Sequence, residues 1–472
     1  MKRIVLSFLF LSWHAPAIAM DLQEYLKTVE NKHKTVQALN VSQEAADLRE
    51  EAGDIDLVPV LTAGVSYLND KSPLSQFALL GATESKNLTY SLGLAKRFST
   101  GTTASVYGNT AEFENEGNIA DPRFQKFGVG ALGVSLSQSL WKDAFGRATR
   151  LRWERLAAAT KAEKGTYDLQ KKLLLIEAET AFWNYFLAEE ALRIGRSSLE
   201  RAKKIEGWTK RRVGDGISDR ADLLETQGLV SARQLQLITV QDEQESAKRQ
   251  IRDYLVLEPG DDFPVLKGDI SQVRPLSSLI EGKTGKVVAL DAYLASLTAK
   301  ATSLAAREVE DAYRPDLVLS GAYNTNAFTD DMPSATSHLT DTEKPTAKIA
   351  LNINYMFDTS VKKAAKDAAR KDALAAQLQS EQKMLNSDSA WIELNRRYIE
   401  MSKRVDAATD SVRIQMSRSK AQSDLFNKGR SITFNVVNAE EDVATAELNL
   451  YRLKSEQRKM EAQGRLFITL EE

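Results

Sequence analysis

The chain has 472 residues, of which 43% are hydrophobic and 27% are charged, and its formal net charge is -2 at pH 7. This composition is typical of a folded protein, and the near-neutral charge gives no basic field that would attract nucleic acid. The chain has no cysteine, and its 3 histidines (His14, His33 and His338) lie far apart in the sequence, which argues against thiolate metal sites, cysteine nucleophiles and histidine clusters. We therefore expect no catalytic residues, no metal and no cofactor.

The first residues have the pattern of a secretory signal. Lys2 and Arg3 precede an apolar run, and Ala17 to Ala19 form an A-x-A cleavage site. We expect residues 1–19 to be a signal peptide and the mature protein to work outside the cytoplasm. The later sequence has no uninterrupted apolar run long enough for a membrane-spanning helix, so any part that crosses a membrane should do so as β-strands.

After a predicted helix, several short runs alternate between apolar and polar residues. The first such runs are 57–67, 87–98, 103–113 and 132–141, and a short turn at 99–102 joins the middle two into a hairpin over 87–113. A period of two with aliphatic residues on one face predicts strands that lie between lipid and a wet lumen. Water-soluble sandwich strands with one wet face are the alternative for any single run.

A long tract without proline follows and predicts a helical hairpin over 144–256. On its first helix, two apolar seams run along neighbouring faces. A helix with one neighbour needs one seam, whereas a helix with neighbours on both flanks needs two. The pattern indicates a multi-helix array, with an ordinary helical bundle as the alternative. The two seams are Leu174, Ala178, Ala181, Tyr185, Ala188, Leu192, and Ile176, Trp183, Leu187, Ile194.

The second half of the chain repeats this order. We predict a helix over 276–312, strands within 314–357, and a second helical hairpin over 361–466, which also lacks proline. The hairpin 87–113 has no counterpart in this half. If the strands form a β-barrel, this hairpin could join the wall of the barrel or fold over its mouth. The sequence therefore divides into a first structural repeat, 20–265, and a second, 266–472.

The turn between the long helices marks the repeat most clearly. In the first half, Gly216 is followed six residues later by Asp222 and then by two leucines. In the second half, Gly429 is followed six residues later by Asn435 and then by two valines. Both turns should lie at the same end of the helices, about 100 Å from the strands at 1.5 Å per helical residue.

This ordered pattern resembles the TolC family of outer-membrane efflux and secretion channels over essentially the whole mature chain. The resemblance rests on LVPVL and RPDLVL at the strands, on LSQSLW before a helix, and on the duplicated glycine-marked turns. It implies a mixed α/β membrane protein, internally duplicated, in which a homotrimer builds an outer-membrane β-barrel continuous with a long periplasmic α-helical barrel. It also implies contact with outer-membrane lipid, and a barrel of twelve strands, or eighteen if the extra hairpin joins it.

The resemblance further implies a function and a site. The protein would be a passive exit duct of a tripartite efflux pump or a type I secretion system, docked to a periplasmic adaptor protein and an inner-membrane pump. Asp219, Asp222, Asn435 and Asn438 would line the periplasmic aperture, although Asn435 stands where the family usually has Asp. Arg220 and Arg430 are candidate latches of the mouth. Gly216, Ile217, Gly429 and Arg430 would form the tips that dock the adaptor.

Two other classes of function remain open. A non-conducting periplasmic coiled-coil scaffold, anchored in the outer membrane, would explain the helices. An extracytoplasmic enzyme with paired carboxylates is a weaker alternative, because pairs such as Glu189 and Glu190 lie on long helices, where charge usually marks a solvated face. We expect no ATPase activity, since the chain has no GxxxxGK[ST] motif. The sequence does not identify the transported substrate.

Overall fold

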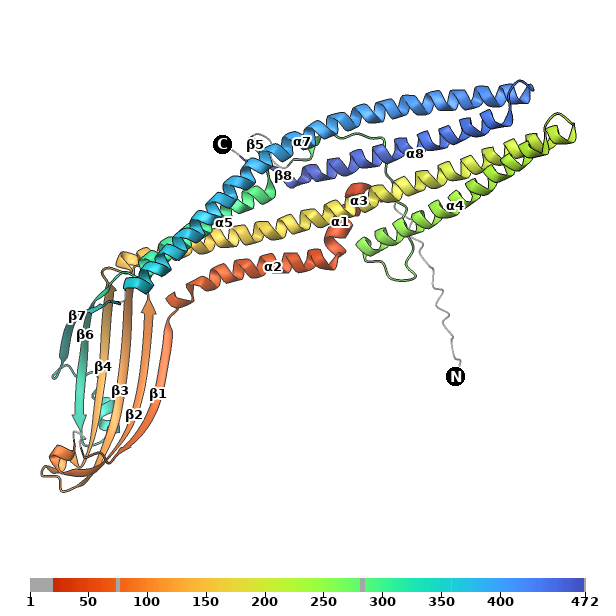
Figure 1. Ribbon diagram of the computed structural model, residues 1–472. Helices are drawn as coiled ribbons and strands as arrows, with labels where there is room; N and C mark the ends of the chain where they lie inside the picture. Colours follow the sequence, from red (N-terminus) through yellow and green to blue (C-terminus); the bar gives the residue numbers. More distant parts are fainter. Residues whose placement is uncertain (1–19, 74–76, 281–284, 358, 471–472) are drawn as a thin grey trace, which may run out of the picture. The chain divides into compact units, whose positions relative to one another are not determined.

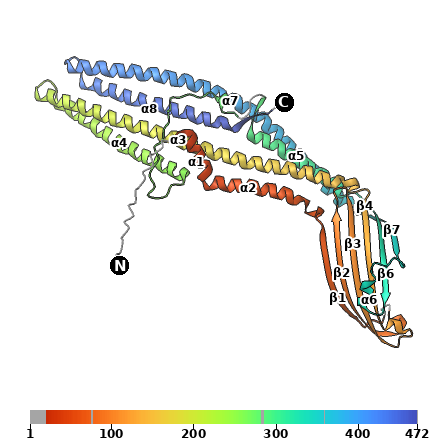
Figure 2. The same cartoon turned by 180° about the vertical axis from the view of Figure 1, so that it is seen from behind.

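A computed structural model describes residues 20–73, 77–280, 285–357 and 359–470; the signal peptide expected over 1–19 lies outside them. The described chain forms two compact units (Figures 1 and 2). The sheet unit comprises Glu44–Lys164 and Leu294–Glu381. The helical unit comprises the residues up to Gln43, Gly165–Tyr293 and the residues from Gln382 onward. Four helices, α2, α3, α5 and α7, have residues in both units.

The sheet unit is built on one six-stranded antiparallel sheet in the order β1-β2-β3-β4-β6-β7. The hairpin expected over 87–113 is formed by β2 and β3 and lies inside this sheet, between β1 and β4. Among the described residues, β1 and β7 each pair on one side only. The strands are β1 (Val60–Asp70), β2 (Ala82–Arg97), β3 (Thr102–Gly117), β4 (Lys126–Ser139), β6 (Asp316–Thr329) and β7 (Thr346–Asn354).

The cross-strand register places aliphatic side chains on one face of the sheet. Leu94 lies opposite both Leu61 and Val106, and Val106 lies opposite Val134. Residues that are directly opposite in an antiparallel pair share a face, so these four form a row across the strands. Their side chains are exposed, Leu61 and Val134 by 67% and 52%. Within the described residues, the side chains of this row are therefore largely uncovered.

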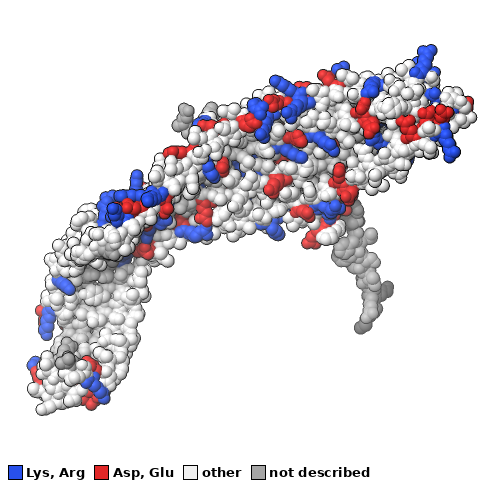
Figure 3. Space-filling view, in the orientation of Figure 1, with Lys and Arg blue, Asp and Glu red and all other residues white. Residues whose placement is uncertain are grey.

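The other face is polar, and the strands carry few charges. Ser105 and Ser135 are opposite each other, and their hydroxyl oxygens are 2.7 Å apart in a hydrogen bond. No charged residue occurs in 60–69, 87–95, 102–111, 127–139 or 317–329, and β7 contains one, Lys348. Figure 3 shows the visible sheet surface almost free of charge, whereas the helices carry both signs. About 9–11 tilted strand residues span a bilayer, so each uncharged run has sufficient length.

Several strand boundaries differ from the prediction, and a short helix was not predicted. The strand expected from residue 57 begins at Val60, because Ala52–Leu57 form a 3-10 turn (η1) and Pro59 has no amide hydrogen to donate. The strands β2, β3 and β4 extend beyond the predicted runs 87–98, 103–113 and 132–141, because polar residues at their ends continue the pairing with the neighbouring strands. A short helix, α6 (Met332–Ser337), follows β6 and packs on β4, where a side chain on Gly128 or Gly130 would clash with its backbone.

The helical unit contains long antiparallel helices with a core near their middle. Tyr25, Phe182, Trp183 and Ile251 pack together in this core and are almost fully buried. The predicted helical hairpins over 144–256 and 361–466 correspond to α3 with α4 and to α7 with α8. The helices are α1 (Leu22–Lys32), α2 (Lys34–Glu51), α3 (Arg147–Gly214), α4 (Arg220–Leu255), α5 (Leu290–Ala312), α7 (Thr359–Asn427) and α8 (Thr433–Gln463).

Both predicted seams of α3 face protein. On the first seam Ala178, Ala181 and Leu192 are at most 6% exposed, and on the second Trp183 and Ile194 are at most 3% exposed. The helix therefore has neighbours on both flanks, as two seams require. The alanines leave room for adjacent helix backbones to approach.

The helix expected over 276–312 is shorter than predicted. It begins at Leu290, after a strand, β5 (Lys286–Ala289), that pairs with β8 (Phe467–Leu470) in a separate two-stranded sheet. The sequence KVVA favours a strand because two adjacent valines are restricted at χ1 and fit a pleated ladder. The partner strand lies almost two hundred residues away, so no local pattern revealed the pairing.

A buried ionic cluster ties α3, α7, α8 and the segment before β5 together. Glu179 and Glu461 are at most 1% exposed, and Arg274 lies within ion-pair distance of both, at 3.4 and 3.7 Å. Arg458, also buried, pairs with Glu461. The Tyr398 hydroxyl donates to the backbone oxygen of Arg274 (2.6 Å). Buried charges need such partners, because removal of one leaves the others unpaired.

Candidate functional site

The turn between α3 and α4 is a glycine-ended helix terminus. Gly216 has φ +71°, a left-handed conformation that only glycine adopts without strain. Its amide donates to the Val213 oxygen (3.1 Å), and the Ile217 amide donates to the Arg212 oxygen (2.8 Å). These are the two bonds of a Schellman motif, which satisfies the last free carbonyls of a helix. The glycine thus fixes where α3 stops and how the chain turns back.

The turn between α7 and α8 repeats this geometry. Gly429 has φ +72°, its amide donates to the Phe426 oxygen (3.0 Å), and the Arg430 amide donates to the Leu425 oxygen (2.8 Å). Each of these residues is 213 positions after its counterpart in the first turn. The two turns have the same backbone structure, although Ile217 in the first is replaced by Arg430 in the second.

The structure brings the two turns into contact through Arg212 and Phe426. The Arg212 Nη1 donates to the Phe426 oxygen (3.0 Å), and its guanidinium lies 4.5 Å from the centre of the Phe426 ring. Phe426 is 1% exposed and packs with Ile205 and Val436 from α3 and α8. A planar cation over an aromatic face is attracted to its negative charge density. This contact links the end of α3 to the end of α7.

The sequence did not single out Arg212 as a linking residue. It lies within a basic run, Lys210 to Arg212, whose three residues look alike in the sequence. Arg212 differs from its exposed neighbours only in its position around the helix, which turns it toward α7. The candidate latches Arg220 and Arg430 are both exposed, and within the described residues their side chains form no ion pair. Among the described cations of the two turns, Arg212 is therefore the one that links them within the chain.

Of the two acidic aperture candidates, Asp222 is engaged in a helix cap. Its carboxylate accepts from the Ser218 hydroxyl (2.8 Å) and from the Asp219 amide (3.3 Å), at the first turn of α4. Negative charge at a helix N-terminus is favourable, so the structural role alone accounts for an acid there. Asp219 is exposed at the N-cap position of α4. Both carboxyl groups lie on the α4 side of the first turn.

The counterparts in the second turn are neutral and less engaged. Asn435 is exposed in the first turn of α8, and Asn438, one turn further on, is half-buried. The N-cap residue of α8 is Ile432, whose side chain cannot accept a hydrogen bond. The docking candidates Gly216, Ile217, Gly429 and Arg430 are all exposed at the turns. The structure thus gathers all the predicted site residues around these two turns.

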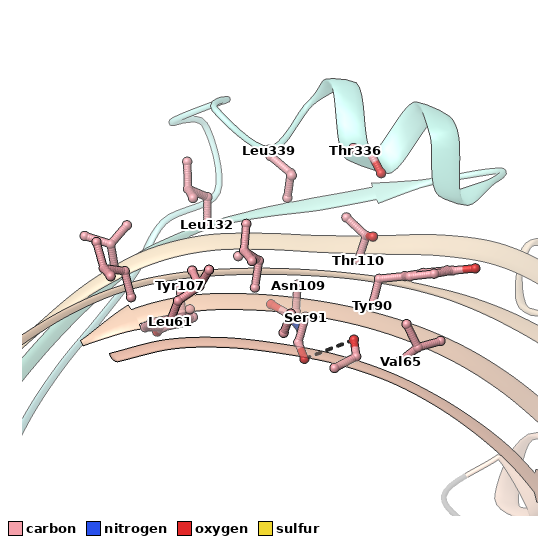
Figure 4. A pocket seen from close by; sticks show the side chains of 17 residues that line it. Leu61, Val65, Tyr90, Ser91, Tyr107, Asn109, Thr110, Leu132, Thr336 and Leu339 are labelled. Carbon is pink, nitrogen blue, oxygen red and sulfur yellow. Dashed lines mark hydrogen bonds between the residues drawn. The ribbon is translucent and has the colours of Figure 1, made fainter. Parts of the chain in front are cut away.

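The sheet unit has a groove on its apolar face. Its volume is about 900 Å³, and its lining includes Leu92, Val106 and Leu132 from β2, β3 and β4. In Figure 4, Leu132 lies below Leu339 and Thr336 of the α6 segment, which forms one side of the groove. The Thr325 hydroxyl donates to the Leu132 oxygen (3.2 Å) and is within hydrogen-bond reach of the Leu339 oxygen, which anchors that segment to the sheet.

In the ranges from 20 to 470 that the structure describes, no helix is both long and apolar enough to cross a membrane. In the same ranges, no group of three or more acidic or histidine side chains is arranged to hold a metal ion.

Several solved structures have this fold. The outer membrane protein VceC from Vibrio cholerae matches with a TM-score of 0.67 and 12% sequence identity, over 93% of this chain and 94% of that chain. The open state of the Neisseria gonorrhoeae MtrE outer membrane channel matches with a TM-score of 0.66 and 16% identity, over 94% and 88%. The Campylobacter jejuni CmeC outer membrane channel gives 0.64 and 14%, over 96% and 87%. No protein-family model matches the chain, and no curated protein matches its sequence.

The chain therefore has the fold of outer-membrane channel proteins. This confirms the TolC-like fold predicted from the duplicated turns and the alternating strands. At these levels of identity the likeness concerns the fold, and side-chain roles have to be argued from this chain's own residues.

Proposed function

We propose that the chain is one protomer of a passive exit duct in the outer membrane of a Gram-negative cell, with its long helices in the periplasm. The observation that carries this proposal is the sheet, whose strands combine uncharged runs of bilayer length with an exposed aliphatic face. The match to outer-membrane channels over nearly the whole chain supports it. Those proteins are channels, and we propose no catalytic role, no cofactor and no metal for this chain.

The duct needs more than one copy. A sheet in lipid has to close on itself, because an unpaired strand edge leaves backbone groups without hydrogen-bond partners. In the proposed homotrimer, the free edge of β1 in one protomer pairs with the free edge of β7 in the next. Six strands per protomer would then give a barrel of eighteen. The matching hydrogen bonds of the two turns support an internally duplicated protomer, with repeats 20–265 and 266–472.

The turns would form the periplasmic mouth of the duct. Asp219 and Asp222 of three protomers would place up to six carboxylates near one axis, with Asn435 and Asn438 beside them. Such a ring favours cations, because several carboxylates near one axis concentrate negative charge there. The bridge from Arg212 to Phe426 would hold the two turns of each protomer together, and Arg220 and Arg430 would remain free to latch neighbouring protomers.

Transport energy would come from partners. An inner-membrane pump and a periplasmic adaptor, as in a tripartite efflux pump or a type I secretion system, would deliver small molecules or polypeptides to the mouth. Gly216, Ile217, Gly429 and Arg430 are the proposed docking tips. Because an apolar and a cationic side chain occupy equivalent places, the adaptor should present an apolar contact to one turn and a carboxylate to the other.

A solute-release assay in liposomes tests this function. Purified protein reconstituted into vesicles should release small entrapped solutes and retain large ones, because release is limited by pore diameter. Protein heated to unfolding before reconstitution is the control. Vesicle-bound, folded protein that releases nothing would instead support the alternative, a non-conducting scaffold anchored in the outer membrane.

A further inference from the structure

Five phenylalanines form one cluster at the end of the sheet where β1 ends and β4 begins, and its strand members lie on the polar face. Phe113 and Phe127 are opposite each other in β3 and β4, and their rings are stacked with centres 5.0 Å apart. They point to the same side as Ser105 and Ser135, because side chains alternate along a strand. Phe328 of β6 stacks on Phe127 at 5.2 Å. An aromatic patch therefore lies on the face that the proposed duct turns toward water.

Phe77 holds the segment between β1 and β2 against this cluster. Its ring lies 5.4 Å from that of Phe113 and 5.9 Å from that of Phe127. The Ala82 amide donates to the Phe77 oxygen (3.0 Å), so the chain turns from this anchor directly into β2. The segment 77–81 is thereby fixed on the polar face.

Phe124 holds the segment between β3 and β4 in the same way. Its ring meets that of Phe127 edge-on, with centres 5.9 Å apart. Asn115 of β3 donates from its side chain to the Phe124 oxygen and from its amide to the Gln125 oxygen, both at 2.7 Å. The segment 118–125 is thereby tied to the polar face at two adjacent carbonyl groups.

The two segments are in contact with each other, and the polar face is covered at this end. Gly81 has φ +94°, and a side chain there would clash with the Asn118 backbone oxygen. Ser85, Ala111 and Asn115, which share the polar face, are at most 7% exposed. Small and polar residues on the open wall of a wet lumen would be accessible to water. The connecting segments therefore fold inward over the face and do not extend away from the strand ends.

Charged residues place this end of the sheet at the polar boundary of a bilayer. Lys126, on the apolar face of β4, forms ion pairs with Glu112 (3.0 Å) and Glu114 (2.7 Å) of β3. Lys126 and Glu114 are opposite each other, one position from the pair Phe113 and Phe127. Charges that face the hydrocarbon are costly, so this level lies at its edge. The strands join the long helices at their other end, so the cluster marks the outer opening of the proposed duct.

We infer that the segments 77–81 and 118–125 form an inward-folded lip, held by the five phenylalanines, that narrows the outer opening and sets the largest solute that leaves the duct. This lip rests on the proposed duct and adds a selective element at its exit. Three copies around one axis would bring three lips together. Phe328, 43% exposed, is the most accessible member of the cluster and would contact a passing solute.

Thiol labelling from outside intact cells tests the lip, and the absence of native cysteines leaves the background clean. Ser91→Cys places a thiol on the exposed part of the polar face, further from the outer end than Ser85. Maleimide-linked polyethylene glycols of graded mass have to pass the lip to reach it. Leu92→Cys is the matched control for the route, because the neighbouring residue points to the apolar face and no polymer should label it in the membrane.

Phe77→Ala, introduced beside Ser91→Cys, should free the segment 77–81 and admit larger polymers. A polymer just excluded by the unmodified lip should label the thiol about tenfold faster, because entry through a pore depends on its narrowest lining. Phe124→Ala should act in the same direction through the other segment. Phe98→Ala is the control, since this exposed ring lies in the turn between β2 and β3 at the opposite end of the sheet, and it should leave the size limit unchanged.

The possible outcomes separate the lip from the duct. Labelling of Ser91→Cys by polymers of every mass at one rate, or a size limit that stays the same in Phe77→Ala and Phe124→Ala, would overturn the lip and leave the duct intact. An equal increase in Phe98→Ala would also overturn it. A thiol at position 91 that even the smallest maleimide fails to label in folded, membrane-inserted protein would refute the wet lumen, and with it the duct.

Discussion

Removal of the Arg212 guanidinium should loosen both turns, including the one that does not contain it. In Arg212→Met the unbranched part of the side chain is kept, but the guanidinium is lost, and with it the hydrogen bond to the Phe426 oxygen and the cation–π contact with the Phe426 ring. A hydrogen bond from a charged donor is worth about 1.5–3 kcal/mol, and a cation–π contact adds about 0.5–1 kcal/mol near a surface. Arg212 is half-exposed, so we take the low end of this sum, about 2 kcal/mol.

Hydrogen exchange at the turn amides measures this loss. At 1.4 kcal/mol per factor of ten, about 2 kcal/mol corresponds to a local opening roughly 30-fold more frequent. The relevant amides are those of Ile217 and Arg430, which donate to the oxygens of Arg212 and Leu425. Exchange of the Arg430 amide is the more informative, because it lies on the other hairpin.

Two variants complete the experiment. Arg211→Met removes an exposed cation one residue away and should leave both amides unchanged. Phe426→Leu keeps the backbone oxygen but removes the ring, so the double variant with Arg212→Met should be less destabilised than the sum of the two. Unchanged exchange at Arg430 in Arg212→Met, or an equal increase in Arg211→Met, would refute the bridge.

Three further substitutions have expected outcomes. Gly429→Ala should destabilise the protein by about 1–2 kcal/mol in thermal unfolding, because alanine at φ +72° is strained. Gly207→Ala, inside α3 with open space around it, is the control and should stabilise the protein by up to about 1 kcal/mol. Equal effects of the two substitutions would contradict this prediction. Burial raises the pKa of Tyr398 above its usual value of about 10, so the unfolded chain loses the hydroxyl proton at a lower pH than the folded chain, and the stability of the folded state falls as the pH rises past that value. Tyr398→Phe should reduce this pH dependence, and it should cost about 1–3 kcal/mol of stability at neutral pH because the acceptors of the hydroxyl lose their donor. An unchanged dependence of stability on pH in Tyr398→Phe would count against this assignment. Asp222→Asn keeps an acceptor for the α4 cap but removes charge, so melting should change by less than about 0.5 kcal/mol while the cation preference of the reconstituted pore falls, and an unchanged preference would remove Asp222 from the proposed aperture.

The long elements could be predicted from the sequence because their signals are local and repeated. A proline-free tract with two apolar seams predicts a long helix that is flanked by other helices on two sides. Ala178 and Trp183, one from each seam, are buried as this prediction requires. The alternation around Val134 fixed which strand residues share a face, and the register confirms it. The glycine spacing located both turns, since only a left-handed residue ends a helix in a Schellman motif.

The remaining features depend on contacts that no local pattern encodes. The pairing of β5 with β8 joins segments almost two hundred residues apart, so Lys286–Ala289, which form a strand, were wrongly predicted as helix. Helix α6 was missed because its six residues are held by packing on Gly128 and Gly130, which sequence spacing does not reveal. At the site, the place of Asp222 at an aperture stays a prediction; what the sequence did not reveal is that its carboxylate accepts hydrogen bonds from the Ser218 hydroxyl and the Asp219 amide as part of the α4 cap. The sequence does not distinguish Arg212 from Arg211; only the packing of α3 against α7 shows that Arg212 contacts Phe426 and Arg211 does not.

Single-channel recording from the purified, full-length protein in planar bilayers tests the central claim most directly. A duct predicts discrete conductance steps from folded trimers, with a small, cation-preferring current that rises when Arg212→Met loosens the turns. Arg211→Met serves as the matched control and should conduct like the unmodified protein. Folded, membrane-inserted trimers that show no conductance in any of these forms would contradict the duct.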